Sequence, residues 1–353
     1  MYYSGIVEGF FGKAWSWDER KAYSTFLKKN KFNFYLYAPK ADSFLRKSWK
    51  QPFPKQHFEH LKGLAKSYRD LGVSFGIGLS PFEVFHRFDS SARQQLREKL
   101  HEIDRIKPAV LGLLFDDMDG NVPDLARLQA EIINFVSDNT ETSRLLFCPT
   151  YYSDDVILDK VFGKRPEHYL EDLGREVASN VDFFWTGPKV ISEELTAAHL
   201  SEVNLRIGRK PFIWDNYPVN DGPRNCKYLH IDAIKGRDPL LSEHTSGYVS
   251  NSMNQSELSK IPLLTISDML NLGRKYDPEK SFNQAVINLY GESHVRFFSS
   301  IRTKLKERGL DQLTHEEKEK IISQVNSIGS RWAEELLDFI DGKYTVGNDC
   351  LTQ

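Results

Sequence analysis

The sequence predicts an α/β protein, a (β/α)8 TIM barrel followed by a C-terminal helical region. Short runs rich in β-branched and aromatic residues recur eight times, at intervals of about one βα unit. Amphipathic stretches separate these runs, and no glycine-rich nucleotide-binding fingerprint follows the first of them. A closed barrel is therefore favoured, with an open doubly wound sheet as the alternative.

We expect each of these apolar runs to form a strand. The runs are residues 4–10, 32–40, 73–81, 109–117, 144–150, 181–188, 211–216 and 246–251. Their apolar residues are nearly continuous, which is typical of parallel strands that are buried on both faces.

Two of the stretches between the runs, residues 54–72 and 91–107, have the clearest helical pattern. Their apolar residues recur at helical spacing, and charged residues occupy the other positions. We expect both to be helices on the outside of the barrel.

The strand pattern stops near residue 275, so we predict a barrel over residues 1–275 and a helical region over residues 276–353. Thr314 and Glu317 form a capping-box pattern, which predicts the start of a helix. Apolar residues then recur at spacings of three and four, namely Ile321, Val325, Ile328, Trp332, Leu336 and Ile340. We expect this single apolar face to pack on the barrel or on a neighbouring helix.

Charge and hydropathy restrict the class of partner. The formal net charge of −2 over 353 residues gives no overall footprint for nucleic acid or an anionic membrane. No segment has the roughly 20 apolar residues needed to span a bilayer, and the N-terminus lacks the basic and apolar parts of a signal peptide. We therefore expect a soluble, cytoplasmic protein without nucleic-acid or membrane partners; the oligomeric state is not predicted.

Cysteine usage gives a further expectation. Cys148, Cys226 and Cys350 are odd in number, widely spaced and compatible with neither a disulfide framework nor a CxxC metal site. We expect free thiols in a reducing compartment, and no cofactor.

The residues at the end of each predicted strand are the candidate functional residues, because the active site of a (β/α)8 barrel lies at this end. They combine aromatic rings, amides, carboxylates and a lysine. Such a pocket suits a neutral ligand rich in hydroxyl groups, since rings stack on sugar C–H faces and the polar groups bind hydroxyls. The residues are Lys40, Asp116, Asp117, Tyr152, Trp185, Thr186, Trp214, Asn216, Asp221 and Asn251.

The adjacent pair Asp116 and Asp117 is the most unusual of these features. Consecutive residues of an extended chain point to opposite sides, so the two carboxylates are expected to have different roles. Their mutual repulsion is expected to raise the pKa of at least one of them, as a general acid requires. A loop or helix-capping pair is one alternative, and a metal site with Asp119 is another, although this segment lacks the calcium-loop spacing.

Seven motifs in order resemble the catalytic domain of family 84 glycoside hydrolases, the O-GlcNAcase and bacterial β-N-acetylglucosaminidase group. The resemblance covers about residues 4 to 260, and the C-terminal helices match the helical region that often follows in that family. The motifs are GIVEGFFGKAW, YLYAPK, LLFDDMDG, FCPTYY, FWTGPKV, IWDNYPVND and GYVSNSM.

The resemblance implies a retaining exo-β-N-acetylglucosaminidase that removes terminal β-linked GlcNAc from a glycoconjugate or oligosaccharide by substrate-assisted catalysis. The 2-acetamido oxygen of the sugar would attack the anomeric carbon and form an oxazoline intermediate. By similarity, Asp116 would orient the acetamido group, and Asp117 would be the general acid and base.

The same resemblance implies the substrate-binding residues. Tyr152 would lie against the acetamido group or the reacting ring, and Trp214 would form part of the wall around the acetyl group. Asn216 would bond near the acetamido carbonyl. Asp221, Asn251 and Lys40 would bind sugar hydroxyls, while Gly9 would let the backbone approach the sugar.

This chain departs from the family at two positions. Phe11 stands where the family commonly has tyrosine, so a hydroxyl that could line the site is missing. Gly222 follows Asp221 where the family often has an aromatic residue, which would help to hold the leaving group. Two alternatives stay open at this point: a catalytically silent GlcNAc-binding barrel and a metal-dependent TIM-barrel hydrolase.

Overall fold

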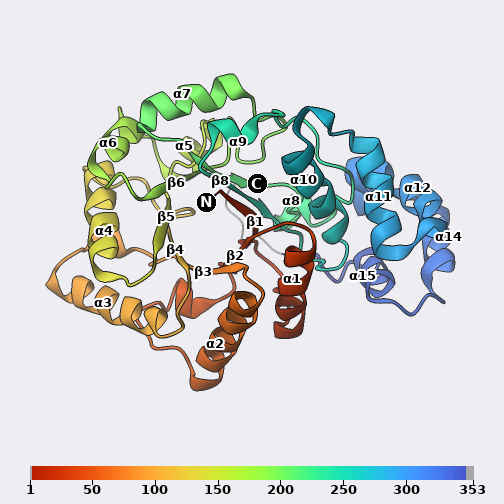
Figure 1. Cartoon of the computed structure of the whole chain (residues 1–353), viewed down its shortest axis with the longest axis horizontal. Helices are drawn as coiled ribbons and strands as arrows, with labels where there is room; N and C mark the ends of the chain where they lie inside the picture. The colour runs from red at the N-terminus through yellow and green to blue at the C-terminus, as the bar shows by residue number, and fades with distance from the viewer. Residues whose placement is uncertain (1, 347–353) are drawn as a thin grey trace.

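A computed structural model, which describes residues 2–346, contains a closed barrel of eight parallel strands in the order β1 to β8 (Figure 1). The closed barrel excludes the open doubly wound sheet, and each of the eight predicted runs matches one strand, although β1 begins one residue before its run. The strands are β1 (Tyr3–Glu8), β2 (Phe34–Tyr37), β3 (Ser74–Leu79), β4 (Val110–Leu114), β5 (Arg144–Cys148), β6 (Asp182–Trp185), β7 (Phe212–Asp215) and β8 (Gly247–Asn251).

Strands β1 and β8 close the barrel. Val7 is the partner of Asn251 in this pairing, and Gly5 is the partner of Val249. Gly5 also allows close contact with β2, because a Cβ atom there would lie 1.8 Å from the carbonyl oxygen of Phe34. The continuous apolar runs are buried between the barrel interior and the surrounding helices, as expected for parallel strands.

Helices cover the outside of the barrel, and α2 and α3 match the two stretches predicted to be helical, although α3 begins one residue earlier than predicted. A capping box of Ser16 and Glu19 starts α1, where each residue bonds the backbone N–H of the other. These helices are α1 (Trp17–Lys29), α2 (Lys55–Asp70), α3 (Ser90–Asp104), α4 (Leu125–Asn139), α5 (Val156–Phe162), α6 (Tyr169–Glu176), α7 (Ala197–Ile207), α8 (Gly222–Asn225), α9 (Leu241–His244) and α10 (Lys260–Leu272). Short 3-10 helices lie at Ser43–Leu45, Val84–His86, Gly273–Lys275 and Glu292–His294.

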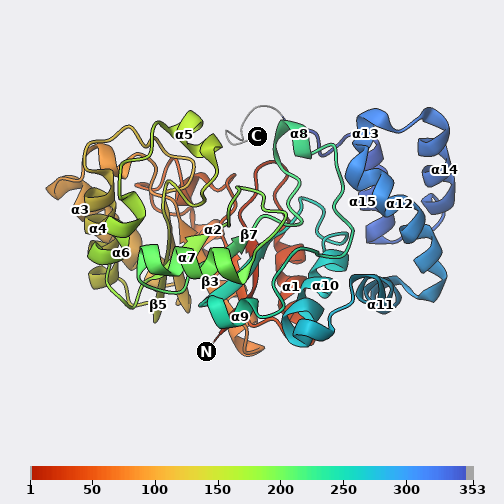
Figure 2. The same ribbon diagram turned by 90° about the horizontal axis from the view of Figure 1, so that it is seen from above.

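The C-terminal helices form a lobe at one side of the barrel (Figure 2). They are α11 (Pro278–Tyr290), α12 (Val295–Glu307), α13 (Gly309–Gln312), α14 (His315–Val325) and α15 (Arg331–Ile340). Their apolar residues form a second core, separate from that of the barrel, around Phe282, Phe298 and Trp332. Met253 and Leu258, which follow β8, also belong to this second core.

The predicted capping box is present, with Thr314 and Glu317 at the start of α14. The expectation of one continuous apolar helical face is wrong between residues 326 and 330. The helix ends at Val325, and Gly329 has a φ of 59°, a left-handed conformation that ends regular helix. The apolar periodicity nevertheless returns in α15, because both helices face the same core.

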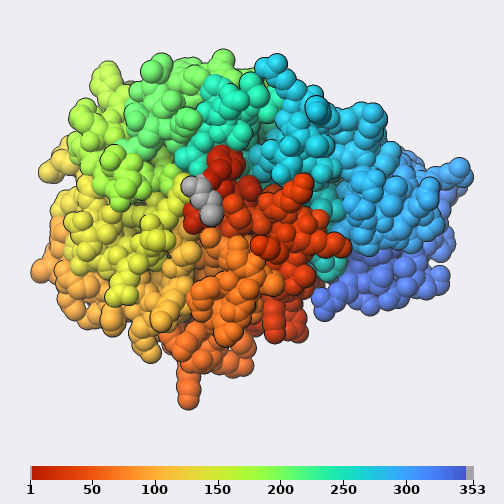
Figure 3. Space-filling model, in the orientation of Figure 1, coloured from red at the N-terminus to blue at the C-terminus, as the bar shows by residue number. Residues whose placement is uncertain are grey.

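The two ends of the barrel differ. The short helices α5 and α8, which follow β5 and β7, lie at the edge opposite the N-terminus (Figure 2). At the N-terminal face the first residues of the chain fill the middle of the surface (Figure 3). The loops after the strands are therefore grouped at one end, as the site requires.

Cys148 and Cys226 are buried free thiols, whereas Cys350 lies outside the described residues. Across residues 2–346, no helix combines the length and the apolar character that crossing a membrane requires.

Candidate active site

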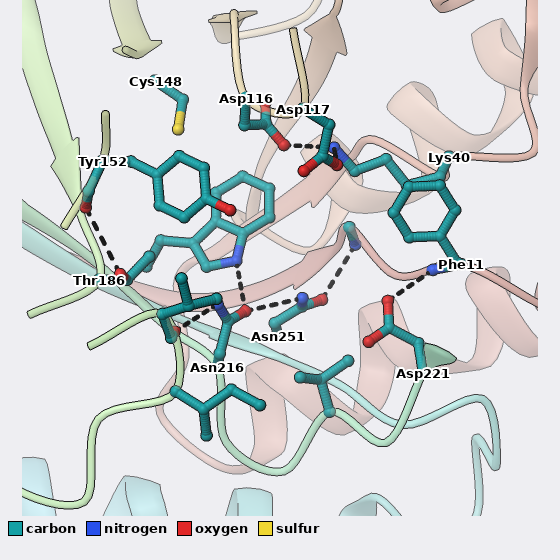
Figure 4. A pocket seen from close by; sticks show the side chains of 15 residues that line it. Phe11, Lys40, Asp116, Asp117, Cys148, Tyr152, Thr186, Asn216, Asp221 and Asn251 are labelled. Atoms are coloured by element: carbon teal, nitrogen blue, oxygen red, sulfur yellow. Dashed lines mark hydrogen bonds and ion pairs between the residues drawn. The ribbon is translucent and has the colours of Figure 1, made fainter. Parts of the chain in front are cut away.

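A pocket opens at the C-terminal ends of the strands, where the active site of a (β/α)8 barrel lies. All nine residues predicted to be catalytic or substrate-binding line it. Its lining consists of Gly9, Phe11, Lys40, Asp116, Asp117, Cys148, Tyr152, Thr186, Val190, Ile191, Trp214, Asn216, Val219, Asp221 and Asn251. Tyr152 and Thr186 lie across the pocket from Lys40 and Phe11 (Figure 4).

Asp116 and Asp117 face the same cation. Lys40 Nζ contacts the Oδ2 atom of Asp116 and lies 3.3 Å from Asp117 Oδ2. The expectation that the two carboxylates point to opposite sides is therefore wrong, because β4 has already ended at Leu114 and Asp117 has a φ of 59°. The turn brings both acids to one end of the pocket (Figure 4).

The two carboxyl groups have different surroundings. Burial raises the pKa of Asp117; the charge of Lys40 opposes this effect, and the charge of Asp116 adds to it. The direction agrees with the prediction, but burial is a larger cause than repulsion between the two acids. Asp116 Oδ1 is buried and has no hydrogen-bond partner among residues 2–346, although Lys40 holds the other oxygen.

A chain of hydrogen bonds fixes the amides opposite the acids. The Gly9 N–H donates to Asn251 Oδ1 over 3.2 Å, and Asn251 Nδ2 donates to Asn216 Oδ1 over 3.0 Å. Asn216 Oδ1 also accepts from Trp214 Nε1 over 3.0 Å, while its Nδ2 donates to the Val190 carbonyl over 2.8 Å. Because an amide nitrogen carries two hydrogens, each asparagine keeps one further N–H for a ligand.

Gly9 is required by the packing of the pocket wall. A Cβ atom at this position would lie 2.3 Å from Cζ2 of Trp214, well inside van der Waals contact. The absence of a side chain therefore lets the indole close one side of the pocket.

Asp221 is held beside the first loop of the barrel. The Phe11 backbone N–H donates to Asp221 Oδ2 over 2.8 Å. Burial raises the pKa of Asp221 to about 6, although the Phe11 hydrogen bond acts in the opposite direction. Phe11 and Asp221 thus form one part of the rim.

The two polar residues after β5 and β6 are joined through the backbone. The Thr186 N–H donates to the Tyr152 carbonyl oxygen over 3.0 Å, and the Tyr152 ring faces the pocket (Figure 4). Trp185, in contrast, does not line the pocket as the sequence suggested. Its Nε1 donates to His199 Nε2 over 3.1 Å, so the indole faces α7 on the outside of the barrel.

Sequence reasoning missed four apolar or weakly polar lining residues: Cys148, Val190, Ile191 and Val219. Cys148 is the last residue of β5 and lies near the end of the predicted run 144–150. Its position close to a strand end could have identified it as a pocket residue. The three aliphatic residues lie in loops, where no periodicity marks their direction.

Two other buried carboxylates lie next to pocket residues but face away from the pocket. Glu8 accepts from Arg20 Nε and Nη2 over 2.8 and 2.6 Å, and from the Tyr35 hydroxyl over 2.6 Å. The Arg20 guanidinium therefore bonds both oxygens of Glu8, and the Tyr35 hydroxyl adds a third hydrogen bond.

Asp215 repeats this arrangement on β7. It accepts from Arg237 Nε and Nη2 over 2.7 and 2.8 Å, and from the Tyr248 hydroxyl over 2.6 Å. The following residue, Asn216, faces the pocket.

Asp119, the third member of the metal-site alternative, is exposed, and its Oδ1 accepts the Asn121 backbone N–H over 2.9 Å. This bond is an Asx turn, as expected of a turn residue. Within residues 2–346, no three His, Cys, Asp or Glu side chains cluster as metal ligands would.

Comparison with known proteins identifies the family of the chain. Residues 4–301 match the family model described as beta-N-acetylglucosaminidase. The chain is 30% identical over 272 residues to the protein O-GlcNAcases of Rattus norvegicus and Mus musculus. This match covers 74% of the chain but only 29% of each relative, so the chain spans under a third of their length.

Solved structures show the same fold. A variant of the O-GlcNAc hydrolase of Thermobaculum terrenum superposes with a TM-score of 0.81 at 28% identity, covering 96% of this chain and 81% of that one. CpGH84B superposes with a TM-score of 0.76 at 26% identity, covering 95% of this chain and 60% of that one. The chain belongs to the beta-N-acetylglucosaminidase family of glycoside hydrolases.

Proposed function

We propose that this chain is a retaining exo-β-N-acetylglucosaminidase that uses the 2-acetamido group of its substrate as the nucleophile. The observation that carries the proposal is the buried Oδ1 atom of Asp116, which has no hydrogen-bond partner in the described part of the chain, residues 2–346. A buried acceptor without a donor is costly, and an acetamido N–H of a bound sugar would supply that donor.

Asp116 orients the nucleophile in this mechanism. Lys40 fixes one oxygen of Asp116, so the other accepts the acetamido N–H in a defined direction. The hydrogen bond increases electron density on the acetamido carbonyl oxygen, which attacks the anomeric carbon and forms the oxazoline. The carboxylate then stabilises the positive charge that develops on the ring.

Asp117 transfers the proton. Its raised pKa favours the protonated form at the start, so it donates to the glycosidic oxygen as the bond to the anomeric carbon breaks. In the second step the Asp117 carboxylate accepts a proton from water, which attacks the same carbon and opens the oxazoline. Two inversions at this carbon give net retention.

The remaining pocket residues bind the sugar. Trp214 and Tyr152 provide the walls around the acetamido methyl group, and Asn216 offers its second N–H near the carbonyl. We assign the hydroxyl groups to Asp221, Asn251 and Lys40, although Lys40 mainly positions the two acids. Gly9 contributes by making room for Trp214.

The decisive experiment compares two aryl β-glycosides that differ only at C2. The N-acetylglucosaminide should turn over, and the glucoside should not, because replacing acetamido by hydroxyl deletes the nucleophile. Comparable hydrolysis of both substrates would rule out the mechanism. A silent GlcNAc-binding barrel would bind the sugar without turnover, and a metal-dependent hydrolase would lose activity in EDTA.

The leaving group and the cellular location are the finer parts of this proposal. Phe11 lines the pocket. Gly222 has a φ of 79°, so an aromatic residue in place of Gly222 would have a strained backbone. A panel of glycopeptide, chitobiose and peptidoglycan-fragment substrates would identify the preferred glycoconjugate. We further propose a cytoplasmic location, supported by the two buried free thiols, which cell fractionation would test.

A further inference from the structure

The loop after β8, residues 252–259, connects the pocket with the C-terminal helices. It begins directly after Asn251, which lines the pocket. Asn254 Nδ2 donates to the carbonyl oxygens of Phe11 and Lys13 over 2.8 and 2.9 Å, and its backbone N–H donates to Asn220 Oδ1 over 3.3 Å. The loop therefore holds the segments after β1 and β7, which carry the rim of the pocket.

Glu335 of α15 holds the other side of this loop. Its side chain is buried and accepts the Glu257 N–H at both oxygens over 2.9 Å, and the Leu258 N–H at Oε2 over 2.9 Å. A single carboxyl group of the helical lobe thus fixes two consecutive peptide units of the loop.

A count of hydrogens indicates which form of Glu335 fits this site. Ser256 Oγ lies 2.7 Å from Glu19 Oε1 and 3.0 Å from Glu335 Oε1, but a hydroxyl has only one hydrogen to donate. Burial raises the pKa of Glu19, but hydrogen bonds from Ser16 and Ser256 outweigh it, and the net pKa is lowered. The contact with Glu19 is the shorter one, and Glu19 is half-buried whereas Glu335 is buried. This geometry favours Glu19 as the charged acceptor of the Ser256 hydrogen, so a neutral Glu335 that donates to Ser256 Oγ fits the site.

The surroundings also favour a neutral carboxyl group. Burial raises the pKa of Glu335 to about 7, against the opposing effect of the two backbone hydrogen bonds. The titratable or charged groups that face it or its partners are Glu19 and Tyr23 on α1, Glu257 with its ion-pair partner Lys260, Tyr290 on α11, Arg331 on α15 and Tyr344.

We propose that Glu335, as a neutral carboxyl group, is a positioning residue by which the helical lobe holds the loop after β8 and, through it, the rim of the pocket. Ionisation places an uncompensated charge in a buried site next to Glu257, so the contact opens more readily as the pH rises. The contact between the lobe and the loop does not depend on the proposed function. The expected effect of this contact on hydrolysis does rest on the proposed function.

The first test measures the link itself. Glu335→Gln keeps the shape and the donor of the neutral carboxyl group, and Glu334→Gln, on the exposed face of the same helix, is the matched control. The folded pKa lies above the ordinary 4.5, so this group stabilises the wild type fully at low pH and the contribution is lost as the pH rises through about 7. We expect Glu335→Gln to gain on the order of several degrees in melting temperature over wild type between pH 5 and pH 8.

Hydrogen exchange of residues 252–259, compared between variants at one pH, provides the local readout. At pH 8 we expect faster exchange in wild type and Glu334→Gln than in Glu335→Gln, with little difference at pH 6. Equal exchange and equal pH dependence of melting in all three proteins would overturn the proposal.

The second test concerns catalysis. At pH 6, Glu335→Ala should raise KM for an aryl N-acetylglucosaminide about tenfold, while Glu335→Gln should stay close to wild type. Faster loop exchange in Glu335→Ala with unchanged KM and kcat would overturn the positioning role. Absence of turnover in the wild type would instead reject the proposed function, and the exchange experiment would still decide on the link.

Discussion

Two sets of buried carboxylates lie at or just after the ends of barrel strands, and they differ in how their oxygens are bonded. Glu8 and Asp215 each receive an arginine fork and a tyrosine hydroxyl. Asp116 and Asp117 share a single lysine, and one oxygen of Asp116 has no partner within residues 2–346. A fully bonded carboxylate stabilises the fold, whereas an incompletely bonded one can bind or react.

The difference follows from where each strand ends. Glu8 and Asp215 are the last residues of β1 and β7, so the extended backbone directs them outward and their successors, Gly9 and Asn216, to the pocket. Strand β4 ends before its acids, and the turn directs both of them inward. The position of an acid relative to its strand end therefore separates the two sets.

The largest effect is expected at the incompletely bonded pair, Asp116 and Asp117. Asp117→Asn should lower kcat/KM for a substrate with a poor leaving group by about 10²–10⁴-fold, because the proton donor is lost. Melting temperature should change little, since asparagine tolerates the left-handed backbone. The exposed Asp119→Asn is the matched control, and wild-type turnover in Asp117→Asn would reject its role as the acid.

Substitution at the fully bonded carboxylates, Glu8 and Asp215, should instead reduce stability and leave activity nearly unchanged. Glu8→Ala leaves the Arg20 guanidinium buried without its partner, which should reduce the free energy of unfolding by about 3–5 kcal/mol. The remaining folded enzyme should keep KM and kcat within a few-fold, measured well below the melting transition. The exposed Glu59→Gln is the control in denaturant titration, and a stable but inactive Glu8→Ala would contradict the distinction.

The pH dependence of stability should show that Asp221, like Asp117, is a pocket carboxyl group with a raised pKa. Its folded pKa of about 6 lies above the ordinary 3.8, so the native state binds more protons and loses stability as the pH rises between these values. The loss should be on the order of 2–3 kcal/mol and absent in Asp221→Asn. Parallel melting curves of variant and wild type from pH 4 to 7 would show that Asp221 does not titrate in this way.

The smallest effect is expected at the wall of the pocket, where Gly9 contacts Trp214. Gly9→Ala places a methyl group against Trp214, and overpacking of this kind costs about 1–3 kcal/mol. KM should rise, because the indole is displaced into the pocket. Gly63→Ala on α2 has open space and should instead stabilise the helix by about 0.5–1 kcal/mol, which calorimetry can resolve.

Much of this architecture could be predicted from sequence. Continuous apolar runs that end in polar residues identified all eight strands and most of the polar residues that line the pocket, whereas the lining residues Cys148, Val190, Ile191 and Val219 were missed. The direction of a side chain could not be predicted where the strand stops early, as at Asp117, or where an outer helix offers a partner, as His199 does for Trp185. These outcomes depend on tertiary contacts that local pattern does not contain.

The second core has a consequence for how the molecule unfolds. The segment that follows the closing strand β8 contributes Met253, Leu258 and Ile261 to the core of the helical lobe. Opening the seam between β1 and β8 therefore strains both cores, and unpacking the lobe releases the strand that completes the barrel. Either fragment alone would lack part of its interior. We therefore expect the barrel and the helical lobe to melt in one cooperative transition.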